Sequence, residues 1–396
     1  MSLGLVRLKA KADRRLRAGH IWIFSNEVDT KITPLGQFQP GEQVVVENAA
    51  GKPLGIAYIN PNTLICGRLI SRDVQYKLDK SLLVHRLNVA MSLRDRMFDK
   101  PYYRLAFGDS DNLPGLVIDR FDDVAVVQIA TAGMEAIKED IIAALQQVIN
   151  PKGILFKNDS QVRQIEGLDE YTEIGAGDVP NQVKLIENNA YFMVPVIDGQ
   201  KTGWFYDHRM NRQRLLNYVK DKRVLDVFSY VGGWGIQSAV AGASETLCID
   251  ASEHALHFVR ENAALNNVNT RVNTIKADAF NALRDLRDEE EKFDVIIIDP
   301  PAFIKRRKDQ AAGEQAYRRI NELAMRLLTR DGILVSASCS MHLKRETLLD
   351  TLRQSSRHLD RHLQILEQGH QGPDHPILPA IPETDYLKAF IARIVY

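Results

Sequence analysis

Cysteine is scarce in this chain of 396 residues, which holds three. Cys66, Cys248 and Cys339 lie far apart, and no CxxC pair or Cys/His cluster occurs. The sequence therefore predicts neither a disulfide framework nor a bound metal. We expect Cys66 and Cys248 to be buried as small hydrophobic side chains. Four histidines match no metal-ligand spacing and are expected in a loop-rich connection: His358, His362, His370 and His375.

Long apolar runs are absent as well, so no segment is expected to enter a membrane. The first 20 residues have neither the apolar stretch nor the small-residue cleavage site of a secretory signal. Their many arginines and few acids also suit a transit peptide. The segment IWIFSNEV follows at once, however, and is typical of a folded chain. We therefore expect a cytoplasmic protein.

An excess of one charge is also lacking, because 51 Lys and Arg balance 51 Asp and Glu. A protein that coats nucleic acid without specificity would usually be basic. Two short basic clusters, in the first 20 residues and at 305–308, suit an enzyme that docks on RNA at defined places. Taken alone, each cluster is better explained as a solvated face. Together they provide six candidate RNA-binding residues: Arg14, Arg15, Arg17, Lys305, Arg306 and Arg307.

The length of the chain suits two or three domains. Residues 1–75 alternate short apolar runs with turns such as Ala-Gly-Lys-Pro, which predicts a small β-rich domain. Residues 76–188 begin with a helical stretch and continue with strands around a helix near 135–147, which predicts a central α+β domain. The Gly-rich segment EIGAGDVPNQ at 173–182 is expected to be a polar boundary ahead of a third domain at 189–396.

From about residue 190, apolar and β-branched runs alternate with helical patterns. Such runs predict parallel strands covered by helices on both faces, which is the α/β, Rossmann-like fold class. In these sheets the ligand lies beyond the carboxyl ends of the strands. The expected strands are 224–228, 246–250, 272–278, 295–301 and 332–339, and the expected helices are 234–241, 252–265, 279–287 and 314–328.

The ends of the first three strands carry residues typical of a nucleoside-containing cofactor site. A Gly-rich loop follows the first strand, and Asp250 ends the second, where a carboxylate can accept hydrogen bonds from ribose hydroxyls. This pair alone suits a nicotinamide enzyme equally well. Asp278 follows the third strand, where it can accept from an adenine amino group, cap the next helix, or do both. The predicted cofactor-binding residues are Asp226, Phe228, Ser229, Tyr230, Gly232, Gly233, Asp250, Ala251, Asp278, Ala279 and Asp299.

The fourth strand distinguishes between these cofactors. It ends Asp299-Pro300-Pro301-Ala302-Phe303, in which two prolines make a stiff turn that holds the acid at the sheet edge. A hydride-transfer enzyme has no evident use for this motif. A methyltransferase that acts on a planar base does, since Asp299 can contact the ring and Phe303 can stack on it beside Pro300. The sequence therefore predicts S-adenosyl-L-methionine as the cofactor.

The fifth strand ends in Ser338-Cys339-Ser340. A thiol at the carboxyl end of a parallel strand points toward the same cleft as the other strand ends. A cysteine there is more often a packing residue. Because Asp299 ends the neighbouring strand, we interpret Cys339 as a catalytic nucleophile.

With these two strand ends, the chain resembles the RlmI family of large-subunit rRNA cytosine-5 methyltransferases. The resemblance implies an RNA-binding PUA domain at 1–75, a central domain at 76–188 and a methyltransferase domain at 189–396. It also implies methyl transfer to C5 of cytosine in large-subunit rRNA. By resemblance alone, Lys201 and Tyr206 line the cofactor cleft. Further similar segments extend over nearly the full length: GHIWIFS at 19–25, GDSDNLPGL at 108–116, KTGWFYDHR at 201–209, DHP at 374–376 and YLK at 386–388.

The chain departs from the family pattern at Ala302, Val231 and His208, where the family often has Lys, Thr and Gln. Related 5-methylcytosine enzymes often carry a second cysteine near the Asp-Pro-Pro turn, and none is present here. Cys339 would therefore act alone. Uridine C5 methyltransferases also place a cysteine after the fifth strand, so the choice of base stays open.

These residues lead to a hypothesis for the reaction. C5 of a pyrimidine is a poor nucleophile, and attack of the Cys339 thiolate at C6 turns the ring into an enamine that can accept a methyl group at C5. Asp299 would contact N3 and the amino edge of cytosine and donate a proton to N3. The base that removes the C5 proton is not identified by the sequence.

Two other classes of protein stay open. One is an N- or O-methyltransferase that acts on another RNA or on a small molecule, with Cys339 purely structural. The other is a non-catalytic RNA-binding factor with this fold, against which the intact set of Asp250, Asp278, Asp299 and Cys339 speaks. The expected partner is RNA, and a homodimer is left open.

Overall fold

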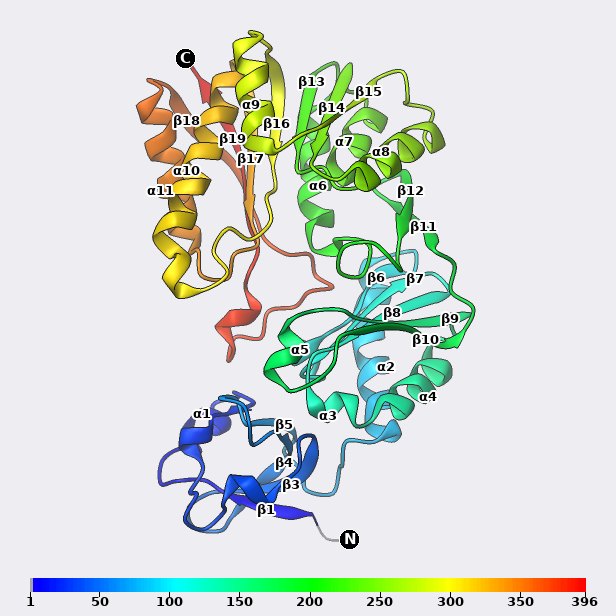
Figure 1. Cartoon of the computed structure of the whole chain (residues 1–396), viewed down its shortest axis with the longest axis vertical. Helices are drawn as coiled ribbons and strands as arrows, with labels where there is room; N and C mark the ends of the chain where they lie inside the picture. The colour runs from blue at the N-terminus through cyan, green and yellow to red at the C-terminus, as the bar shows by residue number, and fades with distance from the viewer. Residues whose placement is uncertain (1–2) are drawn as a thin grey trace. The chain divides into compact units, whose positions relative to one another are not determined.

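The computed structural model describes residues 3–396, which form two compact units (Figure 1). The first unit comprises the chain up to Val183, together with Pro195–Trp204 and Pro373–Thr384. The second comprises Lys184–Val194, Phe205–Gly372 and Asp385–Tyr396. The chain therefore passes between the units more than once, and the boundaries of the three domains expected from the sequence stay a prediction.

The first unit begins with a five-stranded sheet in the order β1-β3-β4-β5-β2. Its hairpin pairs β3 with β4 in antiparallel register, as two apolar runs around a turn predict. Val44 and Val46 on β3 and Ile59 on β4 are buried in its core. The predicted β-rich fold of this part is confirmed. Its elements are β1 (Gly4–Arg7), α1 (Arg14–Arg17), β2 (Trp22–Ile23), β3 (Glu42–Glu47), β4 (Pro53–Ile59) and β5 (Gly67–Ser71).

A second five-stranded sheet of the first unit has the order β10-β9-β8-β7-β6. Leu83 and Leu87 of α2 and Leu145 of α4 are buried against it. Helix α2 begins at Lys80 because the Asp79 carboxylate accepts a hydrogen bond from the Leu82 amide (3.0 Å). The elements are α2 (Lys80–Met97), β6 (Tyr102–Phe107), β7 (Leu116–Phe121), β8 (Val124–Ile129), α3 (Ala132–Glu135), α4 (Lys138–Val148), β9 (Gly153–Asn158), α5 (Val162–Ile165) and β10 (Tyr171–Gly177).

The Gly-rich segment that was expected to be a polar boundary is partly a strand. β10 lies at the edge of its sheet and pairs with β9 in antiparallel register. Its glycines permit a close approach, since a Cβ on Gly175 would lie 2.4 Å from a ring carbon of Phe156. The sequence did not predict this strand, because a Gly-rich edge strand carries little apolar alternation to indicate it. The domain boundary expected at this segment stays a prediction, and the first stretch of the first unit ends directly after it, at Val183.

The second unit contains a seven-stranded sheet in the order β15-β14-β13-β16-β17-β19-β18. The first five strands are parallel, and β19 runs antiparallel to β17 and β18. All five parallel strands and the four helices lie within a few residues of their expected ranges, which confirms the α/β fold class. The elements are α6 (Arg209–Leu215), β13 (Arg223–Val227), α7 (Gly233–Val240), β14 (Glu245–Asp250), α8 (Glu253–Leu265), β15 (Val272–Lys276), α9 (Ala279–Asp288), β16 (Phe293–Ile298), α10 (Gln310–Leu327), β17 (Leu328–Ser338), α11 (Arg345–His358), β18 (His362–Gly369) and β19 (Lys388–Val395), and a separate two-stranded sheet joins β11 (Gln182–Glu187) to β12 (Ala190–Pro195).

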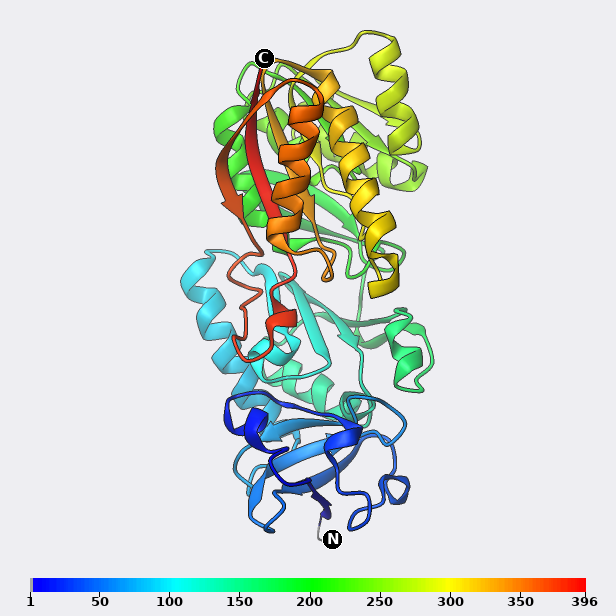
Figure 2. The ribbon, with the colours of Figure 1, turned by 90° about the vertical axis from the view of Figure 1, so that its left-hand side faces the viewer.

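Successive residues of the central strands are buried on opposite faces of this sheet. Leu225 and Ile296 pack with residues of α9, α10 and α11, whereas Val224 and Val295 pack with residues of α6 and α7. Figure 2 shows α10 and α11, in gold and orange, in front of the strands. Both faces are therefore apolar, which is why the strands are nearly continuous apolar runs in the sequence.

The direction in which the sheet grows reverses between β13 and β16. From β13 the chain extends the sheet through β14 to β15, and it then returns to place β16 on the other side of β13. Sheets of this kind bind ligands at the carboxyl ends of the strands, at such a switch point. The loops after β13 and β16 therefore define where a ligand can bind.

The predicted loop-rich connection around four histidines is wrong in part. His358 ends α11 and His362 begins β18, while His370 and His375 lie outside helices and strands. β18 is an edge strand with alternating exposure, so its sequence is more polar than that of the buried strands. Within residues 3–396, no group of three or more His, Cys, Asp or Glu side chains could hold a metal ion. No helix in the same range is long and apolar enough to cross a membrane.

A buried carboxylate connects β11 to α6 and α7. Glu187, whose side chain has no exposed surface, accepts hydrogen bonds from Arg212 (2.6 Å), Gln237 (2.9 Å) and Arg209 (3.3 Å). Both arginines are themselves buried. The carboxylate therefore pairs with the charges of two buried arginines.

Replacing Glu187 with glutamine is expected to lower the free energy of unfolding by about 3–5 kcal/mol, because it removes one partner of a buried set of ion pairs with two arginines. Urea unfolding followed by circular dichroism measures this change. Glu253→Gln is the matched control, because Glu253 pairs with Arg260 on an exposed surface and should leave the midpoint unchanged. Equal stability of the two variants would contradict the assignment.

Candidate active site

The loop after β13 has a backbone conformation that side chains rarely adopt. Phe228 and Tyr230 have φ angles of 65° and 50°, and Gly232 has a φ of 89°. Such strain persists only where the surrounding structure enforces it, and it often marks a ligand site. A Cβ on Gly232 would lie 2.8 Å from Cγ1 of Ile236, so the turn into α7 requires glycine.

Two buried polar atoms beside this loop have no hydrogen-bond partner among the described residues. They are Oδ1 of Asp226 and Oγ of Ser229. The other carboxylate oxygen of Asp226 accepts a hydrogen bond from the Gly235 amide (2.8 Å). Burial, together with the charges of Asp299 and Asp250, raises the pKa of Asp226 to about 7. A cationic donor placed here would satisfy Oδ1 and favour the ionised carboxylate.

Asp250 ends β14, as predicted. Its carboxylate accepts hydrogen bonds from the amides of Tyr230 (2.9 Å) and Ser252 (2.8 Å), which fixes it beside the β13 loop. Each oxygen keeps a further lone pair for a ligand hydroxyl. Ala251, which follows, is exposed.

Asp278 follows β15 and precedes α9. Its carboxylate accepts a hydrogen bond from the Asn281 amide (3.1 Å), so it caps the helix that begins at Ala279. The capping alternative is therefore confirmed. The predicted contact with adenine stays a prediction, and the exposure of Asp278 leaves its second oxygen accessible to a ligand.

Asp299 follows β16 and is held by two side chains that the sequence did not place near it. Nε2 of His208 lies 3.2 Å from Oδ1, and the indole of Trp234 donates to Oδ2 (3.0 Å). Burial alone would raise the pKa of Asp299, but the His208 charge and both hydrogen bonds outweigh it and hold the pKa below its ordinary value. The group is a carboxylate whose side chain is 20% exposed.

The turn containing Cys339 is anchored by its two neighbouring serines. The hydroxyl of Tyr317 on α10 hydrogen-bonds to Ser340 (2.9 Å) and accepts from Ser338 (2.8 Å). Oγ of Ser340 also accepts from the amide of Ile304 (3.2 Å), which lies in the loop that begins at Asp299. One hydrogen-bonded cluster thus connects the two strand ends on which the predicted chemistry depends.

Cys339 is the one cysteine of the three that is not buried. Burial raises the pKa of Cys66 to about 12, and burial raises the pKa of Cys248 well above its ordinary value. The expectation that these two thiols are buried is confirmed. Cys339 therefore has the accessibility that a nucleophile needs.

Lys388, the first residue of β19, is almost completely buried close to the Cys339 turn. Its ammonium donates to the carbonyl oxygens of Ser340 (2.6 Å) and Tyr386 (2.8 Å). Burial lowers the pKa of Lys388 to about 8, while the neighbouring Cys339 and Asp385 act in the opposite direction. A positive charge beside a thiol favours its thiolate form.

Phe303 has a packing role that accounts for an aromatic residue at this position. Its ring centroid lies 4.9 Å from that of Tyr317 and about 6 Å from those of Phe280 (6.1 Å) and Phe228 (6.3 Å). The ring therefore supports the Asp-Pro-Pro turn, in which Pro300 is buried. Stacking of Phe303 on a base stays a prediction.

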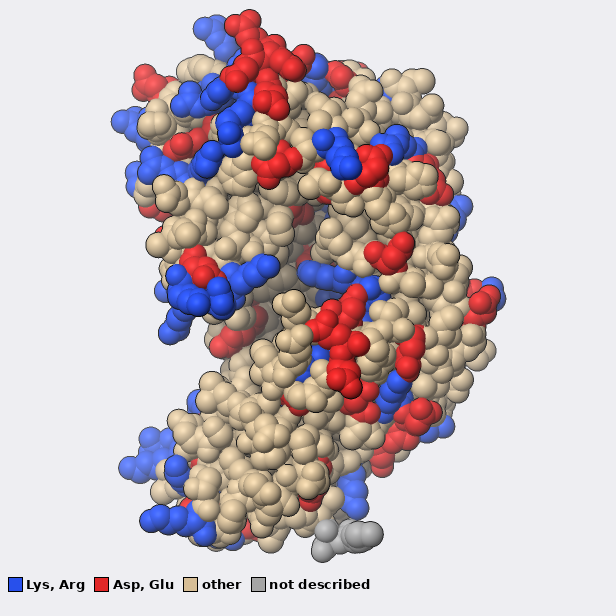
Figure 3. All heavy atoms as spheres, viewed as in Figure 1, with Lys and Arg blue, Asp and Glu red and all other residues tan. Residues whose placement is uncertain are grey.

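The basic residues after this turn are exposed. Figure 3 shows Lys and Arg side chains gathered on the left of the view, where Figure 1 places the start of α10. Arg306 pairs with Asp309 (2.9 Å), whereas Lys305 and Arg307 have no hydrogen bond or ion pair within the described chain. The cluster is thus mostly available to an anion.

The N-terminal basic residues differ from one another. Arg15 pairs with Glu27 through both carboxylate oxygens (2.8 and 2.9 Å), and Arg17 pairs with Asp13 (2.6 Å). Arg14 is exposed. The ion pairs give Arg15 and Arg17 a role in the structure that does not require RNA. RNA binding by the three arginines stays a prediction.

The two residues that were assigned by resemblance lie in different units. Lys201 is exposed in the first unit and has a φ of 49°. Tyr206 has no exposed surface in the second unit, where the Arg209 guanidinium lies 5.1 Å from its ring centroid. Their contact with a cofactor stays a prediction.

Four contributors to this arrangement were missed or given no role in the sequence: Trp234, Tyr317, His208 and Lys388. Trp234 follows the glycine loop directly, and that position was the one available signal for its contact with Asp299. His208, Tyr317 and Lys388 contact residues that are far away in the sequence, and no local sequence pattern predicts such contacts.

The residues around the β13 loop fit S-adenosylmethionine. The unpartnered Asp226 oxygen suits a cationic ammonium group, and Asp250 suits ribose hydroxyls. Beside them, a thiol and a carboxylate end adjacent strands. This combination can hold a methyl donor next to a nucleophilic and a hydrogen-bonding group.

Comparison with known families agrees with this assignment. Residues 6–72 match the PUA-like domain, and residues 161–393 match the S-adenosylmethionine-dependent methyltransferases. Since the second match covers more than half of the chain, the fold and the site define an S-adenosylmethionine-dependent methyltransferase, with S-adenosylmethionine as its cofactor.

Curated relatives narrow the class. Ribosomal RNA large subunit methyltransferase I of Erwinia tasmaniensis is 35% identical over 400 residues and covers 100% of both chains. The protein of the same name from Aliivibrio fischeri strain MJ11 is 36% identical over 388 residues, 97% of each chain. The chain belongs to the ribosomal RNA large subunit methyltransferase I family, and the resemblance predicted from the sequence is confirmed.

Solved structures share the fold over the whole chain. SMU.776, a methyltransferase complexed with SAH, has a TM-score of 0.84 at 21% identity and covers 99% of this chain and 100% of that chain. An S-adenosylmethionine-dependent methyltransferase from Streptococcus mutans has a TM-score of 0.83 with the same identity and coverage.

Binding of S-adenosylmethionine at about pH 6.5 is expected to release a proton. Asp226 has a pKa of about 7 in the free protein and is largely protonated at this pH, and a cationic ligand favours its ionised form. Calorimetry in buffers of different ionisation enthalpy counts the protons. Asp226→Asn should release none, whereas the exposed Asp278→Asn should release as many as the wild type. Zero release by the wild type would contradict the assignment.

Proposed function

We propose that this protein transfers a methyl group from S-adenosylmethionine to C5 of a cytosine in large-subunit rRNA. The observation that carries the proposal is the accessible thiol of Cys339, which one hydrogen-bonded cluster holds on the strand next to Asp299. The curated relatives are named as methyltransferases of large-subunit ribosomal RNA, which supports RNA as the substrate.

The cofactor would be held by the loop after β13 and by the acids that end the neighbouring strands. Asp226 would accept from the amino group of the methionine part, Asp250 would accept from the ribose, and Asp278 would lie near the adenine. Bound there, S-adenosylmethionine supplies an electrophilic methyl group. The further loop residues Phe228, Ser229, Tyr230 and Gly233 complete the proposed cofactor site.

Cys339 would begin the reaction by attack on C6 of the base. The bond between Sγ and C6 forms, and the displaced π electrons make C5 nucleophilic toward the methyl group. After methylation, a base takes the C5 proton, the electrons of that bond form the C5–C6 double bond, and the S–C6 bond breaks to regenerate the thiolate. The proton that N3 took up leaves in the same step and returns by way of Asp299. A single cysteine suffices for this sequence of steps.

Asp299 would recognise the amino edge of cytosine. Because its pKa is low, it is a carboxylate that accepts a hydrogen bond from the exocyclic amino group. Uridine presents a carbonyl oxygen there, which a carboxylate repels. The proton that N3 takes up during attack would come from His208 through Asp299, since Nε2 of His208 lies 3.2 Å from Oδ1. These contacts favour cytosine over uridine.

Lys388 would act through Cys339 as a positioning residue. Its buried charge lies close to the turn and would stabilise the thiolate that attacks C6. Hydrogen bonds to two backbone carbonyls hold its ammonium at this position.

RNA would be positioned mainly through its phosphates. Lys305, Arg306 and Arg307 would contact the phosphates as one cluster. Arg14, Arg15 and Arg17 in the PUA-like part would provide a second contact. The target nucleotide would be flipped into the site, near Pro300 and Phe303. Work on ribosomal RNA implies a cytoplasmic protein, and the homodimer stays a prediction that light scattering would check.

Methyl transfer from labelled S-adenosylmethionine to large-subunit rRNA that lacks native modifications is expected to place the label in 5-methylcytosine. Cys339→Ala should reduce the rate roughly a thousandfold or more, because no covalent adduct can form. Cys66→Ala is the control, since Cys66 is buried in the first unit and should leave turnover unchanged. Nucleoside analysis after digestion identifies the product.

The outcomes separate the remaining classes. RNA that contains 5-fluorocytidine should trap a covalent complex with the wild type and not with Cys339→Ala. Label in another nucleoside, or full turnover by Cys339→Ala, would refute the mechanism. Label in 5-methyluridine would refute the proposed role of Asp299 in particular.

Lys388→Met is expected to raise the pH at which Cys339 becomes reactive by roughly one unit or more, because the thiolate loses a neighbouring positive charge. The alkylation rate with iodoacetamide, measured against pH, reports on this thiol because the other two are buried. Lys388→Arg should restore much of the reactivity. The exposed Lys344→Met should have no effect, and an unchanged profile in folded Lys388→Met would contradict the role.

A further inference from the structure

The first unit contains a cavity of about 810 Å³ that the proposed reaction does not use. It lies where the end of β5, the segment that leads into α2, α2 itself and the turn at Ser110–Asn112 come together. A volume of this size is typical of a pocket for a small molecule or a nucleotide.

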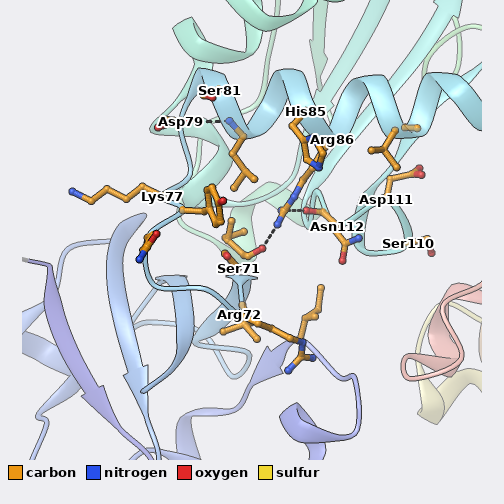
Figure 4. A pocket seen from close by; sticks show the side chains of 18 residues that line it. Ser71, Arg72, Lys77, Asp79, Ser81, His85, Arg86, Ser110, Asp111 and Asn112 are labelled. Atoms are coloured by element: carbon orange, nitrogen blue, oxygen red, sulfur yellow. Dashed lines mark hydrogen bonds between the residues drawn. The ribbon is translucent and has the colours of Figure 1, made fainter. Parts of the chain in front are cut away.

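Arg86 of α2 extends into this pocket (Figure 4). Its two terminal nitrogens donate to the carbonyl oxygens of Ile70 and Asn112, and neither acceptor carries a charge. Burial lowers the pKa of Arg86 to about 10, and no carboxylate compensates its charge within the described chain. Three of its five N–H groups stay available to a ligand.

Other arginines of the first unit show that this lack of a counter-charge is unusual. Each of four others that are largely buried forms an ion pair with a carboxylate, and the pairs are Arg68–Glu166, Arg94–Asp111, Arg104–Asp119 and Arg163–Glu135. A buried charge without a counter-ion costs free energy, which a bound anion would recover.

Neither of the two acids that line the pocket forms an ion pair with Arg86. Asp111 is held by Arg94 through both oxygens (2.7 Å each), and Asp79 caps α2. On the rim, Arg72 and Lys77 are exposed and have no carboxylate partner within the described chain. The pocket therefore carries a net positive charge.

The same pocket presents an aromatic surface. Tyr76 lines it with 58% of its surface exposed, and the equally exposed Val89 of α2 lines it too. An exposed aromatic ring beside uncompensated cations is the combination with which proteins hold unpaired nucleotides, since the ring stacks on a base and the cations contact the phosphate.

We propose that this pocket binds one nucleotide of an unpaired RNA segment, with the phosphate on Arg86 and Arg72 and the base against Tyr76. The inference rests on the proposed function for its choice of RNA over a free nucleotide. The site is a second contact for the substrate, lined by α2 and by the end of the PUA-like match, which stops at residue 72.

The test uses the full-length protein and a labelled single-stranded RNA decamer, with affinity measured by fluorescence anisotropy over a range of salt. Tyr76→Ala should weaken binding roughly fivefold or more, and Arg72→Ala should reduce the slope against salt by roughly one. Both side chains are exposed, so neither variant threatens folding. Arg86→Gln should weaken binding further, with thermal unfolding recorded to confirm that it is folded.

Two control variants distinguish an effect of the pocket from a general loss of positive charge. Arg96→Ala removes an exposed charge from α2 outside the pocket and should bind as the wild type does. The triple variant Lys305→Ala, Arg306→Ala and Arg307→Ala should lower the salt slope independently of the pocket. Affinity for S-adenosylmethionine should be unchanged in all pocket variants, and methylation of rRNA should show a raised KM with an unchanged kcat.

Wild-type affinity and slope in Tyr76→Ala and Arg72→Ala would overturn the proposal, as would an equal loss in Arg96→Ala. Tyr76-dependent binding of cytidine monophosphate without an effect on RNA would also overturn it, in favour of a free nucleotide. If the wild type methylates rRNA and the pocket variants keep its KM, the pocket proposal alone fails. If the wild type transfers no methyl group but the variants still lose RNA affinity, the proposed function alone fails.

Discussion

The hydroxyl group of Tyr317 fixes the geometry on which the candidate site depends. It hydrogen-bonds to the serines on both sides of Cys339, and Ser340 in turn accepts from Ile304 in the loop after Asp299. Tyr317, both serines and Ile304 are all buried away from competing water. The separation of the nucleophile and the acid is therefore set by the packing of α10 on the sheet, and either residue would lose its alignment without that helix.

The parallel strands and their order of appearance were predictable because their burial on both faces leaves a simple signature. Runs such as Val-Ile-Ile-Ile before Asp299 contain no polar position, and their carboxyl ends meet at one edge whatever the rest of the fold does. Asp250, Asp278 and Cys339 could therefore be placed at the same edge of the sheet from the sequence. The edge strands β10 and β18 lack this signature, since one is rich in glycine and the other alternates in exposure.

The electrostatics of the site could not be predicted in the same way. The ionisation of Asp299 depends on His208 and Trp234, and Trp234 is separated from it by 65 residues. The hypothesis that Asp299 carries a proton of its own assumed an isolated carboxyl group. With a donor on each oxygen, the carboxylate form of Asp299 is favoured. The proton for N3 of the base would therefore come from the neighbouring His208.

The position of β19 has a consequence for how the protein is made. This strand lies between β17 and β18, although it is synthesised after both of them. While the chain is still being translated, β17 lacks its antiparallel neighbour, and Lys388 has not yet reached the carbonyl of Ser340. On the proposed role of Lys388, the Cys339 thiol lacks its neighbouring ammonium until β19 has inserted between β17 and β18. The order of synthesis would then keep this cysteine less susceptible to oxidation until β19 is in place.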